Sequence, residues 1–480
     1  MEIHKLQQLL SEMSLQEKIG QMVQLTGVYF DKEAVLTGVV GEQLPPEWVI
    51  QYAGSVLGVI GKEKICDIQS KYMEQHPHHI PLLFMADVIH GCRTIFPIPL
   101  GQACSFHPEL VSEAASIAAS EASSEGLKAT FSPMIDVSRD PRWGRMLESF
   151  GEDPYVNGVM GEAMVDGYQQ KNDEGIAACL KHFAGYGAVN AGREYNDVEI
   201  SQRTFLEQYV KPFRMALKAK PAMVMTAFNA IDRKPISGNK ELLRDLLRDK
   251  EGFDGTVISD WGSIGQLEEQ GVAADMDEAA VQAIEAGVDI DMMSPAYMFR
   301  LEELVKNGQI PESFIDESAF RVLMMKNQLG LFENPFAGLG KSTIVLGGGL
   351  VGCEAAADYI DHGVETTIVE MKGALMPETT GLYRTAVHDF IDKNGGKYEV
   401  NAKVVKVGKD FVVAEQDGKE ITIKADSVVN AMGRRAHATE ALETALKEAG
   451  IPVWKIGDCV RARQIGDAVR EGWTAAMEII

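Results

Sequence analysis

The sequence lacks the cysteine spacings that hold a metal or a disulfide framework. Its six cysteines are scattered without a CxxC pair, and most stand among apolar residues, so we expect reduced and mostly buried thiols. No apolar run approaches the length of a membrane span, and the N-terminal stretch has no basic segment followed by an apolar one. These absences predict a cytoplasmic protein without a cysteine-bound metal.

Positive charge is also scarce. The formal net charge is -24 at pH 7, and a field of that sign repels nucleic acid phosphates and anionic lipid headgroups. We therefore expect neither nucleic acid nor membrane partners, whereas neutral or cationic small molecules remain open.

The length and composition are those of a folded protein with more than one domain. The 480 residues are 45% hydrophobic and 24% charged, with 46 glycines, which is typical of α/β proteins. A change of pattern near Phe336 predicts two domains, residues 1–336 and residues 337–480.

The first predicted domain alternates short apolar runs with stretches of helical period, which favours repeated βα units around a parallel sheet. The expected fold is a (β/α)8-type TIM barrel, although its first strand is hard to place. A helix from Pro311 to about Gly330 should close it. The strand-like runs are VLGVI, PLLFMAD, ATFSP, AACLKH, AMVMTAF, TVISD and VDIDM.

Polar side chains stand at the ends of several of these runs. The carboxyl ends of barrel strands open onto one face, so these side chains should share a site there. Asp260, in TVISDWGS, fits a nucleophile at the rim of a sugar pocket with Trp261 as a wall; capping a helix or pairing with a lysine is the open alternative. The residues at strand ends are Asp87, Lys181, His182, Asp260 and Asp291.

Several separate motifs between about Leu10 and Phe336 together resemble glycoside hydrolase family 3, the family of many β-glucosidases. They are ADVIHG, FSPMIDVSRDPRWGRMLESFGEDP, CLKHFAGYGA, GREYNDVEIS, PFRMALKA and VISDWG. The resemblance implies retaining hydrolysis of a small glycoside or oligosaccharide, with Asp260 as the nucleophile that forms a covalent glycosyl intermediate.

The same resemblance implies roles for the other strand-end residues. Asp87 would accept hydrogen bonds from sugar hydroxyls, and Arg145, Lys181 and His182 would be the remaining hydroxyl ligands of the innermost subsite. Arg145 has an open alternative as part of a structural ion pair, as expected for three neighbours in its segment, Arg139, Asp140 and Arg142.

Aromatic and loop residues complete the predicted site. Phe228 stands where many relatives carry a tyrosine beside the nucleophile, so the wall is kept and a hydroxyl donor is lost. Arg193 and Tyr195 should shape the loop above the pocket. The histidines of HPHH, His76, His78 and His79, are interpreted as a solvated loop, and we predict no metal site.

Retaining hydrolysis also needs a second carboxyl group about 5 Å from the nucleophile. In much of the family a later domain supplies it, and in one branch a histidine and an aspartate on the loop after the KH motif do. The loop FAGYGAVNAGREYN contains no histidine. The acid/base is therefore unassigned: it comes from the second domain, from another subunit of a homo-oligomer, or is missing.

The second predicted domain begins with a glycine-rich turn. Gly347, Gly349 and Gly352 form GxGxxG between a strand and a helix, and Glu370 ends the next strand, 18 residues after Gly352. This pattern is typical of a Rossmann-like domain in which a diphosphate lies at a helix N-terminus and the acidic residue binds a ribose hydroxyl. The alternative of a phosphate loop in GLGKST fails, because Pro335 replaces the required first glycine.

The C-terminal segment resembles the nicotinamide-binding part of the NADH:flavin oxidoreductase and 2-enoate reductase family. The residues that carry this are TIVLGGGLVGCEAAADYIDHGVETTIVEM, VVNAMGRR and VWKIGDCVRARQIGDAVREGWTAAMEI. The resemblance implies NADH at Glu370, and FAD contact at the IGD stretch that contains Asp458. No earlier GxGxxG unit precedes Lys341, so we expect FAD binding to be weak or absent.

The junction therefore resembles a fusion of parts from two unrelated enzymes. A diverged form of the usual second domain of family 3 is the alternative for residues 337–480. Three functions stay open: a β-glucosidase-type hydrolase that needs no cofactor, an NADH-dependent oxidoreductase or nucleotide-binding module on a scaffold barrel, and a protein that binds sugar without cleaving it.

Overall fold

The chain divides into two compact units, Met1–Leu339 and Gly340–Ile480. The computed structural model describes residues 1–31, 44–170, 175–335, 342–361, 364–377, 379, 381–408, 411–433, 439–456, 459–460 and 465–479. No helix in these ranges is long and apolar enough to cross a membrane. Each unit is described by itself.

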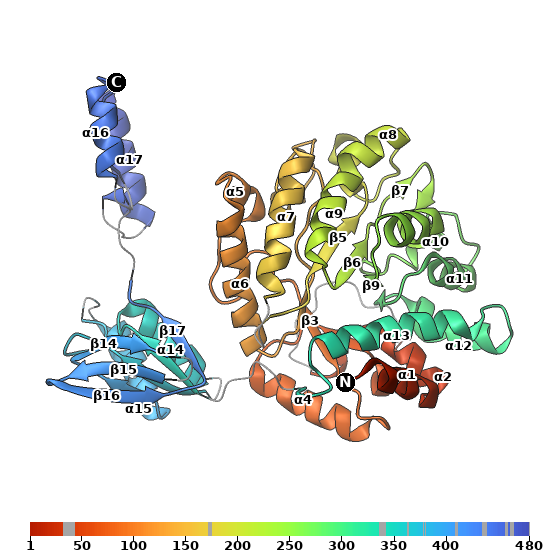
Figure 1. Ribbon diagram of the computed structural model, residues 1–480, viewed down its shortest axis with the longest axis horizontal. Coiled ribbons are helices and arrows are strands. Elements are labelled where there is room, and N and C mark those ends of the chain that lie inside the picture. The colour runs from red at the N-terminus through yellow and green to blue at the C-terminus, as the bar shows by residue number, and fades with distance from the viewer. Residues whose placement is uncertain are drawn as a thin grey trace. The chain divides into compact units, whose positions relative to one another are not determined.

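Parallel strands form the centre of the first unit (Figure 1). One sheet has five strands in the order β10-β1-β2-β3-β4, and a second has three in the order β5-β6-β9. Single bridges join the two sheets, from Ala129 to Ala177 and from Ile258 to Ile290. The strands are β1 (Val23–Thr26), β2 (Ser55–Leu57), β3 (Leu83–Ala86), β4 (Ala129–Thr130), β5 (Cys179–Phe183), β6 (Met223–Thr226), β9 (Thr256–Ile258) and β10 (Asp291–Met292).

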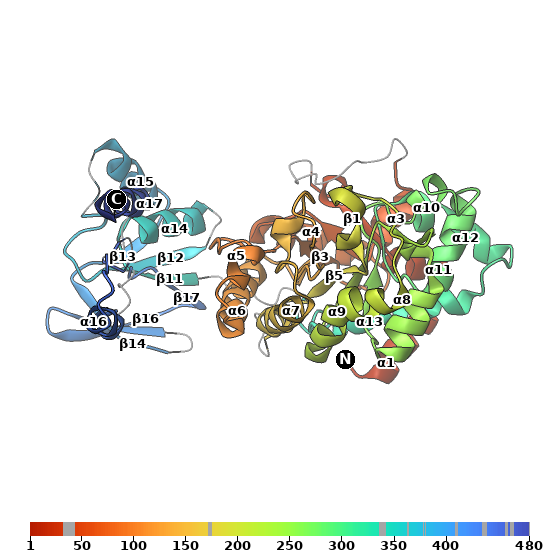
Figure 2. The same ribbon diagram turned by 90° about the horizontal axis from the view of Figure 1, so that it is seen from above.

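Helices surround these strands, as Figure 2 shows from above. A short hairpin of β7 (Ala230–Ile231) and β8 (Lys234–Pro235) lies between β6 and β9, and π-helical turns span Phe205–Val210 and Glu241–Lys250. The helices are α1 (Ile3–Glu12), α2 (Leu15–Gln21), α3 (Glu47–Tyr52), α4 (Lys62–Gln75), α5 (Pro99–Ala103), α6 (Pro108–Ser124), α7 (Pro154–Tyr168), α8 (Gln202–Thr204), α9 (Lys211–Ala216), α10 (Gln266–Glu269), α11 (Met276–Ala286), α12 (Pro295–Lys306) and α13 (Glu312–Gln328).

The core of the first unit has two layers because successive strand residues point to opposite faces. On β3, Phe84 and Ala86 pack in the layer between strands and helices, whereas Leu83 and Met85 pack in a second cluster with residues from the other strands. All four side chains are buried. Strands that are apolar on both faces read as continuous apolar runs, which is why the sequence predicted them.

The expected α/β organisation is confirmed, and the predicted apolar runs coincide with β2–β6, β9 and β10. The strand that could not be placed is β1, with the sequence VQLT. Its Gln24 and Thr26 are buried, and Gln24 donates to the Sδ of Met85. A strand with polar side chains facing inward does not show an apolar pattern.

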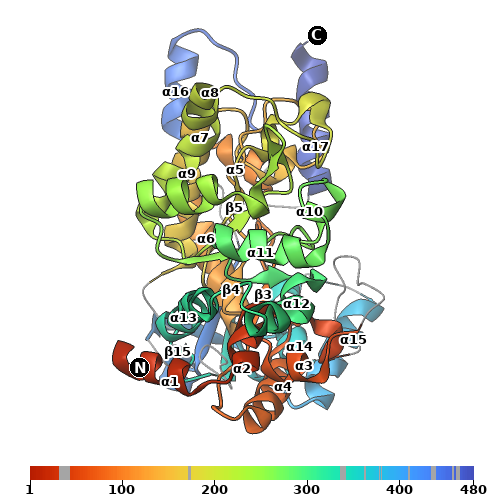
Figure 3. The same cartoon turned by 90° about the vertical axis from the view of Figure 1, so that its right-hand side faces the viewer.

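The helix expected to close the first unit is confirmed as α13. Pro311 is its N-cap residue, and Gly330 has a positive φ of 71° just beyond its end. The helix lies beside α1 (Figure 3), where Leu6 and Met13 share a small buried cluster with Leu323. The first and last helices of the unit therefore stabilise each other.

The second unit combines two sheets. Four parallel strands have the order β13-β12-β11-β17, and β14, β15 and β16 form an antiparallel sheet. One apolar cluster lies between the parallel strands and the helices, and another involves both sheets. The elements are β11 (Ser342–Leu346), α14 (Leu350–Asp361), β12 (Glu365–Val369), α15 (Leu382–Lys393), β13 (Lys397–Glu399), β14 (Ala402–Val407), β15 (Phe411–Gln416), β16 (Lys419–Lys424) and β17 (Ser427–Asn430).

The predicted order of strand, glycine turn, helix and strand is confirmed here. The next strand, β13, pairs in parallel with β12. The chain then turns at Asn401, which has a positive φ of 54°, and enters the antiparallel sheet. Alternation alone cannot tell which neighbour a short strand will join.

Two further helices, α16 (Glu440–Glu448) and α17 (Ile465–Ile479), end the chain. They carry exposed large apolar side chains, Leu442, Val469, Trp473 and Met477. These two helices thus expose several large apolar side chains to solvent.

Candidate active site

The first unit places the predicted catalytic residues at the carboxyl ends of its parallel strands. Asp87 follows β3, Lys181 and His182 lie in β5, and Asp260 follows β9. The Nζ of Lys181 is 3.2 Å from Oδ1 of Asp87, and the Nε2 of His182 is 3.3 Å from Oδ2 of Asp260. The structure therefore brings residues together that are far apart in sequence.

Asp260 is buried, and one of its oxygens is left available. The backbone N–H of Trp261 donates to Oδ1 at 2.7 Å, whereas Oδ2 receives no hydrogen bond from any described residue. Burial raises the pKa of this carboxyl to about 6, while Arg145, Trp261 and Lys181 lower it. At neutral pH the group is mostly ionised, with a free oxygen, as a nucleophile requires.

His182 is held by a carboxylate that the sequence did not single out. Oδ2 of Asp136 accepts from the backbone N–H of His182 at 2.9 Å and lies 2.7 Å from its Nδ1. Burial raises the pKa of Asp136 and lowers the pKa of His182, so the ring stays neutral. The only signal for Asp136 was an acidic residue between apolar neighbours in FSPMIDVS.

Arg145 forms the ion pair that was one of its two predicted roles, and its role as a sugar ligand stays a prediction. It forms a bidentate ion pair with Glu148, in which Nε donates to Oε1 at 2.7 Å and Nη2 donates to Oε2 at 3.0 Å. Burial opposes its charge, but the Glu148 carboxylate raises the pKa of Arg145 above its usual value, and Asp260 adds to this electrostatically. The ion pair thus holds a permanent positive charge close to the proposed nucleophile. Arg142 pairs with Asp140, as expected.

Lys181 and Asp87 form a charged pair in which only one member is accessible. The Lys181 side chain is 4% exposed, whereas that of Asp87 is 43% exposed. The buried ammonium group of Lys181 can therefore neutralise and orient the Asp87 carboxylate, which stays accessible to a ligand. This arrangement suits an acceptor of sugar hydroxyls.

Aromatic rings line the same region. Phe228 is buried after β6, and its ring meets that of Tyr195 at 4.8 Å and that of Tyr186 at 5.9 Å between centroids. Trp261 is partly buried against the core. Arg193 is exposed and donates to the carbonyl of Asn190. Phe228 and Tyr195 thus pack against each other, and Trp261 directly follows Asp260 in the chain; their roles around a sugar stay predictions.

Asp291 has a different task from the other strand-end residues. Its Oδ2 accepts from the hydroxyl of Ser294 at 2.6 Å and from the backbone N–H of Tyr297 at 3.0 Å. These bonds cap the start of α12. Asp291 is therefore a structural residue.

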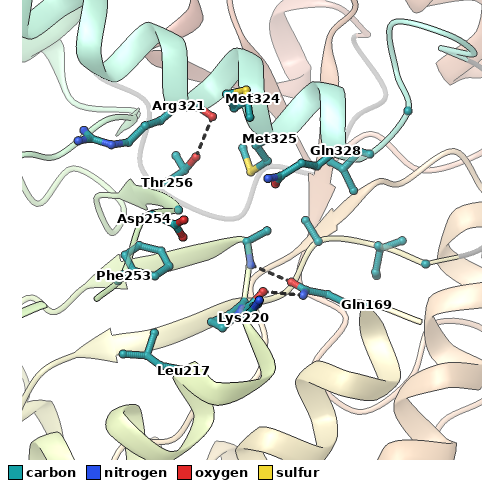
Figure 4. Close-up of a pocket in the computed structure, with 18 of the residues that line it drawn as sticks. Gln169, Leu217, Lys220, Phe253, Asp254, Thr256, Arg321, Met324, Met325 and Gln328 are labelled. Carbon is teal, nitrogen blue, oxygen red and sulfur yellow. Dashed lines mark hydrogen bonds between the residues drawn. The ribbon is translucent and has the colours of Figure 1, made fainter. Parts of the chain in front are cut away.

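A hollow in the first unit lies at the other ends of the strands (Figure 4). It has a volume of about 1220 Å³ and is lined by residues that precede β5, β6 and β9 and by residues of α13. Gln169 bridges its wall by donating to the carbonyl of Lys220 and accepting from the N–H of Ala222. Parallel strands separate this hollow from Asp260, so it is not the candidate active site.

The HPHH stretch is not a simple solvated loop. His76 is fully buried, and burial lowers its pKa to about 4. The Nδ1 of His78 lies 2.7 Å from Oε1 of Glu17, and the N–H of His78 donates to Nδ1 of His76. These three side chains lie close enough to surround an ion, but hydrogen bonds among them already use both Nδ1 atoms. That no metal binds here stays a prediction.

The glycine turn of the second unit is tightly packed at two of its glycines and open at the third. Gly347 has a positive φ of 105°, and a side chain on Gly352 would overlap the carbonyl oxygen of Gly347. A side chain on Gly349 would meet no atom within 4 Å, so the backbone there is open to a ligand. These glycines fit the predicted roles.

Glu370 does not fit the ribose role in this arrangement. Its Oε2 accepts from the N–H of Gly348 at 2.5 Å and its Oε1 from the N–H of Lys372 at 2.7 Å. The residue is buried and both oxygens already hold backbone N–H groups, so the carboxylate is not presented to a ribose hydroxyl. Asp458, expected at a flavin, lies outside the described residues.

Comparison with known proteins agrees with these observations. The model of the glycosyl hydrolase family 3 N-terminal domain matches residues 14–325. A periplasmic β-glucosidase of Salmonella typhimurium is 39% identical over 336 residues, which are 69% of this chain and 43% of that protein. A putative β-xylosidase of Formosa agariphila is 36% identical over 353 residues, 68% of this chain and 46% of that protein.

Solved structures agree as well. The β-glucosidase of Listeria innocua in complex with glucose has a TM-score of 0.69 and 38% identity, covering 82% of this chain and 63% of that one. The model of the pyridine nucleotide-disulphide oxidoreductases matches residues 310–472. The chain spans less than half the length of the two hydrolase relatives described above. Through residues 14–325, the chain belongs to glycosyl hydrolase family 3.

Proposed function

We propose that the chain is a retaining glycoside hydrolase of β-glucosidase type with Asp260 as its nucleophile. The observation that carries this is the free Oδ2 of Asp260, at a buried strand end beside His182 and within the field of Arg145 and Lys181. A buried, ionised carboxylate with one oxygen free can attack an anomeric carbon. No cofactor is needed for this reaction.

We infer a (β/α)8-type barrel for the first unit and a Rossmann-like domain for the second. The bridges at Ala129 and Ile258, which join the two parallel sheets, support the first inference. The parallel sheet and the glycine turn before α14 support the second. NADH stays the proposed ligand of that turn, on the strength of the glycines alone.

The proposed reaction has two steps. Oδ2 of Asp260 attacks the anomeric carbon, the bond to the leaving oxygen breaks, and its electron pair stays on that oxygen. A glycosyl ester forms with inverted configuration. Water then attacks the same carbon, loses one proton to solvent or to the unassigned base, and releases the sugar and the carboxylate; the leaving oxygen takes up one proton in turn. Two inversions give net retention. Asp87, Lys181 and His182 hold the sugar hydroxyls during both steps.

The proposed substrate is a small β-glucoside. Relatives are named as β-glucosidases and β-xylosidases, and the structures of the Listeria innocua enzyme contain glucose, laminaribiose or isofagomine. The accessible carboxylate of Asp87 beside Lys181 supports a ligand that carries hydroxyl groups. The acid/base is unassigned, because much of the family takes it from a later domain and this chain matches less than half the length of its two relatives.

Two aryl β-glucosides test this function. One carries a highly activated phenol that leaves without protonation, and the other a poor leaving group. Cleavage of both means that an acid/base is present in the chain or its oligomer. Cleavage or a stoichiometric burst with only the activated substrate means that Asp260 attacks without one. Failure with both contradicts the proposed activity.

Replacement of the nucleophile provides the matched control. Asp260→Asn should lower turnover of the activated substrate by about 10⁴-fold or more, because an amide does not attack the anomeric carbon. Asp254→Asn, an exposed change before β9, should leave turnover unchanged. Equal turnover of the wild-type chain and Asp260→Asn would sink the assignment.

A further inference from the structure

Tyr186 lies at the centre of the candidate active site, although its sequence position gave no hint of this. Its ring meets that of His182 edge to face at 5.2 Å and that of Trp143 at 5.2 Å. The ring of Phe228 lies 5.9 Å away, and the guanidinium carbon of Arg145 is 5.7 Å from the centroid. One fully buried side chain thus contacts two predicted sugar ligands and one predicted wall.

The far end of Tyr186 is anchored by Glu194. The Tyr186 hydroxyl donates a hydrogen bond to Oε2 of Glu194, and this bond, after burial, raises the pKa of the phenol above its ordinary value. Oε1 of Glu194 is buried without a partner among the described residues. The carboxylate therefore has this hydroxyl as its one described donor, which makes the bond costly to lose.

The loop that carries both residues is fixed by close backbone contacts. A side chain on Gly187 would overlap the carbonyl of Val137, and one on Gly192 would overlap the backbone at Trp143. Tyr186 and Glu194 thus have fixed positions on one loop. Tyr186 contacts the site residue His182, and Glu194 binds the hydroxyl of Tyr186.

We propose that Tyr186 and Glu194 form a positioning pair for the sugar subsite. The hydrogen bond fixes the tilt of the Tyr186 ring, and the ring fixes the orientation of His182 and of Arg145. Neither partner needs to touch the substrate. The inference rests on the proposed hydrolase function and adds two residues to it, one of which, Glu194, stands between the two loop residues that the sequence had favoured, Arg193 and Tyr195.

The test compares variants that break the bond from either side. Tyr186→Phe keeps the ring and removes the hydroxyl, and Glu194→Ala removes the acceptor. Each should weaken glucose binding, measured by calorimetry, and lower kcat/KM for the activated aryl β-glucoside by about tenfold, the value of one charged hydrogen bond. Because both act through one bond, the double variant should lose about tenfold, not a hundredfold.

Rescue separates positioning from direct contact. Glu194→Gln keeps an oxygen that accepts from the tyrosine hydroxyl, so it should restore most of the binding and turnover. The exposed Glu199→Ala on the same loop is the matched control and should behave as wild type. Loss in both Glu194 variants with none in Tyr186→Phe would mean that Glu194 binds sugar itself, which overturns the proposal. Loss confined to the poor leaving group would make Glu194 the proton donor and overturn it equally.

The two levels of the argument fail in different ways. A wild-type chain that neither binds glucose nor cleaves the activated substrate contradicts the proposed function and the positioning role with it. A wild-type chain that does both, with Tyr186→Phe and Glu194→Ala unchanged, contradicts only the positioning pair.

Discussion

The end of β9 and the end of β12 each carry a buried carboxylate, yet the two are used in opposite ways. At Asp260, one oxygen accepts a backbone hydrogen bond and the other receives none from the described residues. At Glu370, both oxygens accept from backbone N–H groups of neighbouring turns. Burial at a strand end therefore does not by itself identify a reactive group, and the two carboxylates differ in whether an oxygen is left without a donor.

Asp291 supports the same distinction within the first unit. Like Asp260 it is buried at a strand end, and burial raises its pKa to about 6 as well. Its oxygens are nevertheless occupied by Ser294 and Tyr297. Three strand-end carboxylates thus separate into one with a free oxygen and two that hold the backbone.

The largest expected effect concerns the backbone of the second unit. Gly352→Ala places a methyl group on the carbonyl oxygen of Gly347, and backbone atoms cannot move aside as a flexible side chain can. We expect a loss of about 3–5 kcal/mol in the free energy of unfolding of this unit. Hydrogen exchange of peptides from β11 and β12 would measure it separately from the first unit.

Gly349→Ala is the matched control for that clash. The added methyl group meets no atom within 4 Å, so exchange of β11 and β12 should stay within about 0.5 kcal/mol of wild type. Equal destabilisation by the two substitutions would mean that Gly352 does not lie against the carbonyl oxygen of Gly347. The packing of the turn that holds Glu370 would then be in question.

Some of this arrangement was visible in the sequence, because it depends on local pattern. Apolar runs predicted β2–β6, β9 and β10, and residues that follow a strand fall at its carboxyl end whatever the rest of the chain does. Asp87, Lys181, His182 and Asp260 could therefore be placed together. The glycine spacing likewise predicted the turn before α14.

The remainder depends on contacts between distant segments, which no local pattern encodes. Asp136 holds His182 across 46 residues, and Gln24 in β1 bonds to Met85 across 61. His76 is buried because Tyr52 and Tyr72 pack around its ring, and its local sequence reads as polar. Glu370 was expected to bind a ribose hydroxyl. Its actual partners, the N–H groups of Gly348 and Lys372, reach it only in the folded turn, so the sequence does not reveal them.

The next effect is a gain of stability from removing the nucleophile. Burial raises the pKa of Asp260 from 3.8 to about 6, so its contribution to stability is present below pH 3.8 and is lost as pH rises through 6. Asp260→Asn removes that cost, and its amide can also donate to Nε2 of His182. At pH 7 the free energy of unfolding of the first unit should rise by about 1–3 kcal/mol.

Asp291→Asn is the control from a carboxylate with occupied oxygens. The same cost of a buried charge is removed, but the amide has one acceptor oxygen in place of two, so the gain in the free energy of unfolding at pH 7 should be smaller than for Asp260→Asn by about 1–2 kcal/mol. Denaturant unfolding at pH 7 and at pH 4 would compare both variants with wild type. A loss of stability in Asp260→Asn at pH 7 would show that its Oδ2 is satisfied after all.

A smaller effect is expected at the end of β12. Glu370→Gln replaces one carboxylate oxygen by an NH₂ group, which cannot accept from a backbone N–H. The free energy of unfolding of the second unit should fall by about 1–2 kcal/mol. Glu365→Gln, on the same strand, breaks only the exposed pair with Lys397 and should change the unfolding free energy by less than about 0.5 kcal/mol. Indistinguishable variants would mean that Glu370 is free to serve a ligand.

The smallest effect is a pH dependence that reads the Asp260 carboxylate directly. Attack requires the ionised form, and burial raises the pKa of Asp260 to about 6. The kcat/KM for the activated aryl β-glucoside, which reports the free enzyme, should therefore be constant near pH 7 and about tenfold lower at pH 5. Because this substrate needs no protonation, the acidic limb belongs to the nucleophile and not to a proton donor. A profile that stays flat to pH 4.5 would contradict the raised pKa of Asp260, and with it the picture of a buried carboxylate that has one free oxygen.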